Sequence, residues 1–271
     1  MIASLHPITA KLNEKRKWTG MISKQIYRGI VLVLVSLTFS CVTPSEHQKK
    51  AAEDYKIIGS EYYHQGNFSA ALKNFLEAEK AYPADAELHN LLGLTYKAKK
   101  RNDLAVRHFQ KAIDLAPGYS IAKNNLGTVY LDLGKWDQAI PCFKEAANDL
   151  TYETPHLASF NLAGAYYGKG DYGLAEQYYG RALEYRPNFV RAMRGLALAH
   201  IAMGRYEEAV GQLEQAIRIA PRMPNLYYDL AEAYSLSGRY GKARRSYGKV
   251  IELVPGSPLA AEAEKRMGKN P

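Results

Sequence analysis

From residue 52 onward, apolar positions recur three and four residues apart in short segments, with polar positions between them. This spacing places the apolar side chains on one face of a helix. The segments come in pairs, and most pairs end at a proline that lies 34 residues after the preceding one and would stop a helix. The pattern predicts two helices per unit, near positions 2–14 and 17–29. The units begin at Ala52, Ala86, Ser120, His156, Val190 and Pro224.

Small residues recur at two fixed positions of every unit. Position 20 is always alanine, and position 8 is glycine or alanine. Helix backbones approach closely only where side chains are small, so the two helices of a unit are expected to cross here, beside a large side chain at position 24. A glycine follows the first helix in five units, which indicates a left-handed turn. The second unit has Lys100 instead, and a strained or differently shaped turn is expected there.

The residues that recur at these fixed positions resemble the tetratricopeptide repeat pattern over residues 52–257. The resemblance implies an all-α fold, a right-handed superhelical solenoid of about six helix-turn-helix repeats. Ser257 and Pro258 are typical of an N-cap and a first-turn proline. Residues 258–271 are therefore expected to form a capping helix and tail that covers the last apolar face.

The register of the repeats breaks once, between the third and fourth units. The third unit lacks its closing proline, and two extra residues appear before the fourth. Insertions in a repeat array lie in loops on one face. The segment Asp149–Pro155 (DLTYETP), followed by Asn161-Leu162 and a tyrosine-rich helix, is similar to the type IV pilus biogenesis lipoproteins of the pilotin class. That resemblance implies a lipidated repeat protein that helps to place an outer-membrane secretin.

Residues 1–40 are expected to be a signal peptide. An uncharged, mostly apolar run at 29–39 follows basic residues and precedes the small Ser40, which is the layout of a secretory signal. A helix that spans a bilayer needs about 20 apolar residues, which makes a membrane-spanning signal-anchor the less favoured alternative. Residues 1–20 resemble an upstream over-extension of the reading frame that is not translated, because Met21 starts a signal of normal length.

Cys41 follows Ser40, and here the chain resembles a bacterial lipoprotein signal, in which this cysteine is acylated and becomes the mature N-terminus. Thr38 stands where the family prefers leucine. Residues 41–51 are expected to be the lipidated cysteine and a flexible tether. Val42, in place of an aspartate, implies the periplasmic face of the outer membrane, with an inner-membrane anchor or secretion to the periplasm as alternatives.

Charge and motifs exclude several other functions. The formal net charge is +9, but residues 1–40 account for +5 of it, whereas nucleic-acid binding needs a clustered positive excess. No phosphate-binding loop, HExxH, GxSxG or CxxC motif is present. The histidines fall at different unit positions, and Cys142 has no partnering histidine and aspartate in its repeat. We therefore expect no catalytic residue, no cofactor and no metal, and a buried, hydrogen-bonded His200.

The first helix of each repeat in such a solenoid lines the concave wall, and its inward positions offer a surface for a partner. Side-chain amides there can pair with the backbone of an extended peptide, aromatic side chains can anchor it, and arginines can take a carboxylate. The candidate residues are Asn124, Asn125, Phe160, Asn161, Tyr167, Arg191, Arg194 and Tyr228. Docking on the convex side is the alternative.

Together these features predict a non-enzymatic, protein-binding scaffold of the bacterial cell envelope. Its partner would be an extended segment of an envelope protein, and by resemblance a pilus secretin whose assembly it assists. A lipid at Cys41 would hold it to a membrane, and no nucleic acid is expected as a partner. The alternatives are a periplasmic adaptor for peptidoglycan enzymes or outer-membrane protein assembly, and a subunit of cytochrome maturation.

Overall fold

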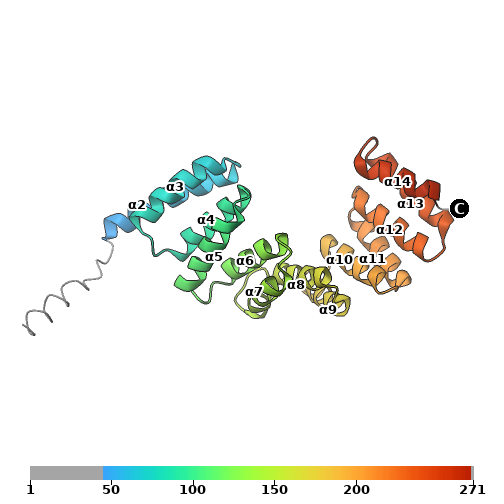
Figure 1. The fold of residues 1–271 in the computed structure, drawn as a ribbon, viewed down its shortest axis with the longest axis horizontal. Coiled ribbons are helices and arrows are strands. Elements are labelled where there is room, and N and C mark those ends of the chain that lie inside the picture. The colour runs from blue at the N-terminus through green and yellow to red at the C-terminus, as the bar shows by residue number, and fades with distance from the viewer. Residues whose placement is uncertain (1–44, 270–271) are drawn as a thin grey trace, which may run out of the picture. The chain divides into compact units, whose positions relative to one another are not determined.

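The computed structural model describes residues 45–269, and this part of the chain is all-α (Figure 1). The first helices of the six predicted repeats, called A helices below, are α2 (Glu46–His64), α4 (Ala86–Ala98), α6 (Ser120–Asp132), α8 (Pro155–Lys169), α10 (Val190–Ala202) and α12 (Pro224–Leu236). The second helices, called B helices, are α3 (Phe68–Ala81), α5 (Asn102–Leu115), α7 (Trp136–Asn148), α9 (Tyr172–Tyr185), α11 (Tyr206–Ile219) and α13 (Tyr240–Leu253). A final helix, α14 (Pro258–Lys269), follows them. The predicted fold class, six helix pairs and a capping helix, is confirmed.

The small residues lie where the helices of a repeat meet. The six alanines at position 20 are completely buried. In the first three repeats the phenylalanine at position 24 is also fully buried and lies against the glycine at position 8 of the same repeat. A Cβ atom added at Gly59, Gly93 or Gly127 would come within 2.6 Å of that ring. The close approach of the two helices therefore requires glycine at these positions.

The turns between the paired helices use a left-handed backbone, as predicted. Gly66 and Gly134 have φ of 75° and 68°, and Gly170, Gly204 and Gly238 are also positive. Lys100 has φ of 59° and is the non-glycine residue with positive φ among those described. The second repeat therefore keeps the shape of the turn without the residue that adopts it most easily.

The start of α2 corrects the predicted tether. The helix begins at Glu46, inside the segment 41–51 that was expected to be flexible. Ser45 and Gln48 form a capping box, in which the Ser45 backbone N–H donates to Gln48 Oε1 (2.8 Å) and the Gln48 backbone N–H donates to Ser45 Oγ (3.2 Å). The polar segment was interpreted as a tether because it has no apolar period, but from Glu46 onward it forms the first turns of α2, capped by Ser45 and Gln48. The predicted signal peptide and Cys41 lie outside the described residues.

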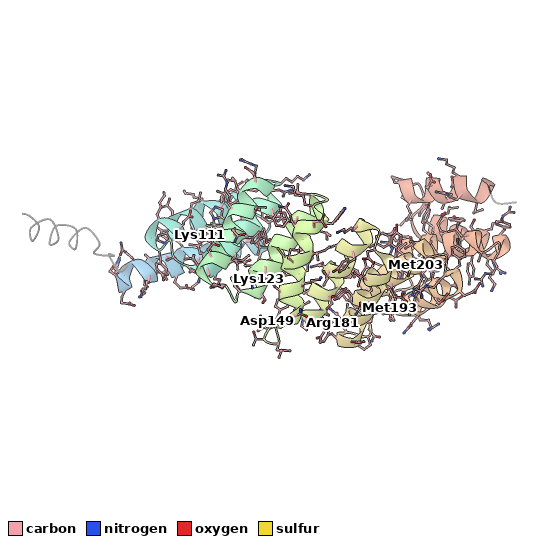
Figure 2. All side chains as sticks on the ribbon, turned by 60° about the horizontal axis from the view of Figure 1, so that its bottom comes forward. Lys111, Lys123, Asp149, Arg181, Met193 and Met203 are labelled. Carbon is pink, nitrogen blue, oxygen red and sulfur yellow. The ribbon has the colours of Figure 1, made fainter. Side chains whose placement is uncertain are left out.

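The connection between α7 and α8 contains the two inserted residues and packs against both neighbouring repeats. Asp149 accepts hydrogen bonds from Ser120 Oγ (2.5 Å), at the start of α6, and from Thr151. Tyr152 is buried among alanines of α7 and α8. Arg181 of α9 donates to the carbonyl of Ala147 (3.0 Å) and so satisfies the end of α7 (Asp149 and Arg181 are labelled in Figure 2). The connection is therefore fixed by contacts with α6, α7 and α8.

The last helix covers the apolar face of the sixth repeat, as predicted. Ser257 Oγ accepts a hydrogen bond from the backbone N–H of Ala260 (3.1 Å), and Pro258 occupies the first turn. Ala260 and Ala263 are buried, and Ala263 belongs to the same core cluster as the side chains of α12 and α13. Of the helices within residues 45–269, none has the length and apolar character needed to cross a membrane.

Candidate functional site

The A helices of neighbouring repeats touch one another. Beyond the contacts within each repeat, α4 contacts α6, α6 contacts α8, α8 contacts α10 and α10 contacts α12. The side chains at positions 5 and 6 of these helices meet across this line. We call the surface that they form the A-helix wall; its members at these positions include Asn90, Asn124, Asn125, Phe160, Asn161, Arg194 and Asp229.

Two pairs of side-chain amides link successive helices of the A-helix wall. Asn125 Nδ2 donates to Asn90 Oδ1 (2.9 Å), and Asn161 Nδ2 donates to Asn124 Oδ1 (3.0 Å). In both pairs position 6 of one repeat bonds to position 5 of the repeat before it. The amides were expected to be available to a peptide backbone, but each pair already uses one N–H and one oxygen. Asn90 and Asn124 are buried, whereas Asn125 and Asn161 are partly exposed. The second amide N–H and the carbonyl oxygen of Asn125 and of Asn161 are thus held in fixed orientations at the surface.

The same two positions hold an ion pair further along the wall. Arg194 Nε donates to Asp229 Oδ2 (2.5 Å), from α10 to α12, and Nη2 lies 3.4 Å from Oδ1. Asp229 is buried, and burial raises the pKa of its carboxyl, although the hydrogen bonds and charge of Arg194 act in the opposite direction. Arg194 was predicted to take a carboxylate from a partner. Within the described residues it takes one from its own chain instead.

A second charge cluster surrounds Lys56, a buried lysine of the first repeat. Lys56 Nζ lies 2.8 Å from Glu53, 3.2 Å from Asp85 and 2.7 Å from Glu87. Burial lowers the pKa of Lys56, but hydrogen bonds from Glu53, Glu87 and Asp85 and the charge of Asp85 outweigh it and raise the pKa. Lys56 is therefore committed to joining α2 to the start of α4.

Between the fourth and fifth repeats, cationic and aromatic side chains form a stack that we call the Arg191 cluster. It consists of His156, Phe160, Arg186, Phe189 and Arg191. The Arg191 guanidinium lies 5.4 Å from the ring centre of Phe160 and 5.3 Å from that of Phe189. Arg186 lies 5.6 Å from Phe189, and the two phenylalanine rings are 5.1 Å apart. Two separately predicted candidates, Phe160 and Arg191, are therefore brought together, and the buried Phe189 contacts both.

The Arg191 cluster carries an unbalanced positive charge. Arg186 and Arg191 are exposed, and no ion pair to Arg191 occurs among the residues that the structure describes. Burial, together with the charges of both arginines, lowers the pKa of His156. Phe189 and Arg186 were missed by sequence analysis because they precede α10 rather than lying on it. The aromatic residue two positions after Pro187 was the signal that could have identified them.

Tyr167 and Tyr228 lie apart from the Arg191 cluster. The Tyr167 ring is 5.3 Å from that of Tyr172, and the Tyr228 ring is 5.7 Å from that of Tyr247. Both are partly buried, and burial raises the pKa of each hydroxyl. Each therefore presents only part of its ring to a partner.

Cys142 and His200, to which sequence analysis gave no catalytic role, both lie in surroundings that fit a packing role. Burial raises the pKa of Cys142 to about 11, so its thiol is protonated at neutral pH and is a poor nucleophile. His200 is buried as predicted, and its Nε2 lies 3.1 Å from Glu176 Oε1.

Sequence models described as tetratricopeptide repeat match residues 59–100, 85–151, 118–188, 160–224 and 202–266. Among solved structures, the crystal structure of PilW, described as a widely conserved type IV pilus biogenesis factor, has a TM-score of 0.74 at 21% identity and covers 79% of this chain and 98% of that chain. The structure of PilF of Pseudomonas aeruginosa has a TM-score of 0.71 at 18% identity and covers 82% of this chain and 100% of that chain. At these identities the likeness concerns the fold.

A curated relative, BBSome complex member BBS4 of Bos taurus, is 27% identical over 205 residues, which are 76% of this chain and 39% of that protein. The chain thus spans well under half the length of the curated relatives that it matches first. The shared part is the repeat array, a fold that typically binds proteins and carries no catalytic site. With paired helices throughout and repeat matches from residue 59 to residue 266, the chain belongs to the tetratricopeptide repeat family.

Proposed function

We propose that this chain is a non-enzymatic assembly factor of the bacterial cell envelope, whose A-helix wall holds an extended segment of a type IV pilus secretin. The likeness in fold to PilW and PilF supports this proposal, since both cover nearly their whole length on this chain. The inserted segment between α7 and α8, which prompted the resemblance to pilus lipoproteins, packs as an integral part of the array.

The observation that carries the proposal is the Arg191 cluster, which adjoins this wall at Phe160. Its two exposed guanidinium groups are already oriented by stacking on phenylalanine rings, so little side-chain entropy is lost when a partner binds. A segment with an acidic side chain beside an aromatic or aliphatic one would satisfy both the charge and the ring surface. The partly exposed amides of Asn125 on α6 and Asn161 on α8 would bond to the backbone of the same segment, without selecting its sequence.

In this proposal the chain lies on the periplasmic face of the outer membrane, held by an acyl group on Cys41. Anchoring to the membrane that contains the secretin raises the local concentration of both partners, so a weak contact at the wall is sufficient.

Charge reversal at the Arg191 cluster tests the proposed function. In a strain that lacks the chromosomal copy, Arg191→Glu should fail to restore secretin multimers and surface pili, while the wild-type chain restores both. Arg107→Glu is the matched control, because Arg107 is an exposed arginine on the B helix α5. If both variants restored secretin multimers equally well, the wall would not be the binding surface.

A photo-crosslinking amino acid identifies the partner independently. Placed at Phe160, it should capture the secretin in living cells, and placed at Tyr185, an exposed side chain at the end of α9, it should not. Capture of the secretin from Tyr185 alone would move the binding surface to the B helices. Capture of a peptidoglycan enzyme from Phe160 would replace the proposed partner.

A further inference from the structure

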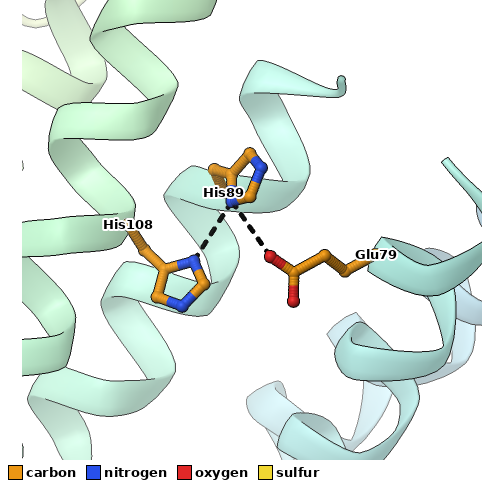
Figure 3. Close-up of side chains that lie close together, drawn as sticks. All are labelled: Glu79, His89 and His108. Atoms are coloured by element: carbon orange, nitrogen blue, oxygen red, sulfur yellow. Dashed lines mark hydrogen bonds and ion pairs between the residues drawn. The ribbon is translucent and has the colours of Figure 1, made fainter. Parts of the chain in front are cut away.

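Three potential metal ligands from three helices converge between the first and second repeats. Glu79 lies on α3, His89 on α4 and His108 on α5 (Figure 3). His89 Nδ1 is 3.1 Å from His108 Nδ1 and 3.7 Å from Glu79 Oε1. One ligand atom of each residue lies within 4.8 Å of the other two. Sequence analysis judged the histidines to be scattered because they occupy different positions of the repeat. The antiparallel helices nevertheless bring two of them together.

The surroundings of His89 determine which of its ring nitrogens carries the proton. His89 Nε2 lies 2.9 Å from the carbonyl oxygen of Pro83, which can only accept a hydrogen bond. Nε2 therefore carries the proton, and in the neutral ring the lone pair is on Nδ1, directed toward His108 and Glu79. Metal-ligating histidines are oriented in this way, with the second ring nitrogen donating to a backbone carbonyl.

The other two side chains are also positioned. The His108 ring stacks between His89, at a centroid distance of 5.4 Å, and Tyr96, at 5.2 Å. Glu79 is about one third exposed, whereas His89 is almost completely buried. The cluster is therefore rigid on its histidine side and open to solvent on its carboxylate side, where an ion and a water molecule can enter.

We propose that Glu79, His89 and His108 bind a divalent transition-metal ion of the zinc class. Two imidazole nitrogens and one carboxylate, with water at the fourth position, form a ligand set that suits Zn²⁺. Two ligand atoms on a tetrahedral zinc ion are about 3.3 Å apart, as follows from metal–ligand distances of 2.0–2.2 Å. The 3.1 Å and 3.7 Å separations at His89 Nδ1 are close to this value, so side-chain adjustments of a few tenths of an ångström complete the geometry on that side.

In the absence of a metal the two histidines share a hydrogen bond. Since His89 Nδ1 carries the lone pair, His108 Nδ1 is the donor in that bond. On metal binding His108 moves its proton from Nδ1 to Nε2, and both Nδ1 lone pairs then face the ion. No net charge is lost or gained by the two rings. The ion would join α3 of the first repeat to both helices of the second.

Metal titration of the full chain in detergent, without a polyhistidine tag, tests this proposal. After chelator treatment, Co²⁺ should bind with a stoichiometry of one and give visible d–d bands that one equivalent of Zn²⁺ abolishes. Glu79→Gln and His108→Gln should each weaken Zn²⁺ binding at least tenfold. Glu77→Gln is the matched control, because Glu77 lies on the same helix and pairs with Lys80 instead. It should bind Zn²⁺ with wild-type affinity.

Circular dichroism and thermal melting decide between loss of a ligand and loss of the fold. If His108→Gln is unfolded, Glu79→Gln decides, since its partly exposed side chain is the easiest of the three to replace without a structural change. Absence of saturable Co²⁺ binding by the wild-type chain would overturn the proposal. Equal Zn²⁺ affinity in the wild type and in a folded Glu79→Gln variant would also overturn it, because the ion would then be bound elsewhere.

Discussion

The ring of Tyr179, on α9, lies directly against the backbone of Gly195, on α10 of the following repeat. In the first three repeats the ring at position 24 packs instead on a glycine of its own repeat. The fourth repeat has Ala163 in place of that glycine, at position 8. Its position-24 ring, Tyr179, lies against Gly195 of the neighbouring repeat instead. The methyl group of Ala163 on α8 is thus accompanied by a glycine, Gly195, on α10, where the ring needs space.

Replacement of Gly195 by alanine should destabilise the array, because the new Cβ would overlap the ring of Tyr179. Overpacking of this kind costs about 1–3 kcal/mol, measured as the free energy of unfolding in urea. Gly180→Ala on α9 is the control, since nothing lies within 4 Å of its added Cβ. It should stabilise by up to about 1 kcal/mol through helix propensity. Equal effects of the two variants would contradict the close contact.

Lys100→Gly should stabilise the second repeat. A side chain in the left-handed region costs about 1–2 kcal/mol, and glycine removes that cost while adding some entropy to the unfolded chain. We expect a net gain of about 0.5–1 kcal/mol in the free energy of unfolding. The reverse change in the third repeat, Gly134→Lys, should destabilise by a similar amount. A loss of stability in Lys100→Gly would show that the lysine side chain makes contacts that outweigh the strain.

Asp229 should give stability a pH dependence of defined sign. Because burial raises the pKa of this carboxyl in the folded chain, the native state holds the proton more tightly than the unfolded chain. The stabilisation of the folded chain that results from this raised pKa is present below the ordinary pKa of 3.8 and is lost as the pH rises through the raised pKa. The free energy of unfolding of Asp229→Asn minus that of the wild type should therefore increase with pH in this window, by at most about 1.4 kcal/mol per pH unit. A constant difference between pH 3 and pH 7 would refute this reasoning.

Cys41→Ser should release the chain from membranes. Acylation requires the thiol, so the serine variant should appear in the periplasmic fraction of lysed cells while the wild type sediments with the outer membrane. Cys142→Ser is the control, since Cys142 lies on α7 within the repeats, and this variant should remain bound. Continued sedimentation of the Cys41→Ser variant would reject the lipid anchor.

The repeated columns could be predicted from the sequence because the same packing problem recurs in every unit. Ala139 and Ala175 are small for the same reason, and both are fully buried where two helices cross. The strain at Lys100 could be predicted too, because the other repeats have glycine at this turn position and a side chain there is unfavourable in the left-handed region. The alternative of a differently shaped turn was wrong, since Lys100 has a positive φ like the turn glycines. Packing and turn requirements of this kind can be inferred from the sequence of one repeat, and the inference is strengthened when the other repeats show the same residues.

The pairing of polar side chains across repeats could not be predicted in the same way. Asn125 and Asn161 both occupy position 6, which suggested a common role, but each bonds to position 5 of the preceding repeat, at Asn90 and Asn124. The shift from position 6 to position 5 depends on how one A helix is placed along the next. The sequence of a single repeat carries no information about that placement. The cluster of His89 and His108 escaped notice for a related reason. Residues at different positions meet when antiparallel helices fold back on each other.

The capping box at Ser45 has a consequence for where the array stands. Only four residues separate Cys41 from Glu46, and a chain of that length reaches about 17 Å at full extension. With Cys41 acylated, the first hairpin must therefore sit beside the lipid headgroups, with no long stalk beneath it. Under the proposed function, a secretin segment that met this end of the array would have to emerge close to the bilayer.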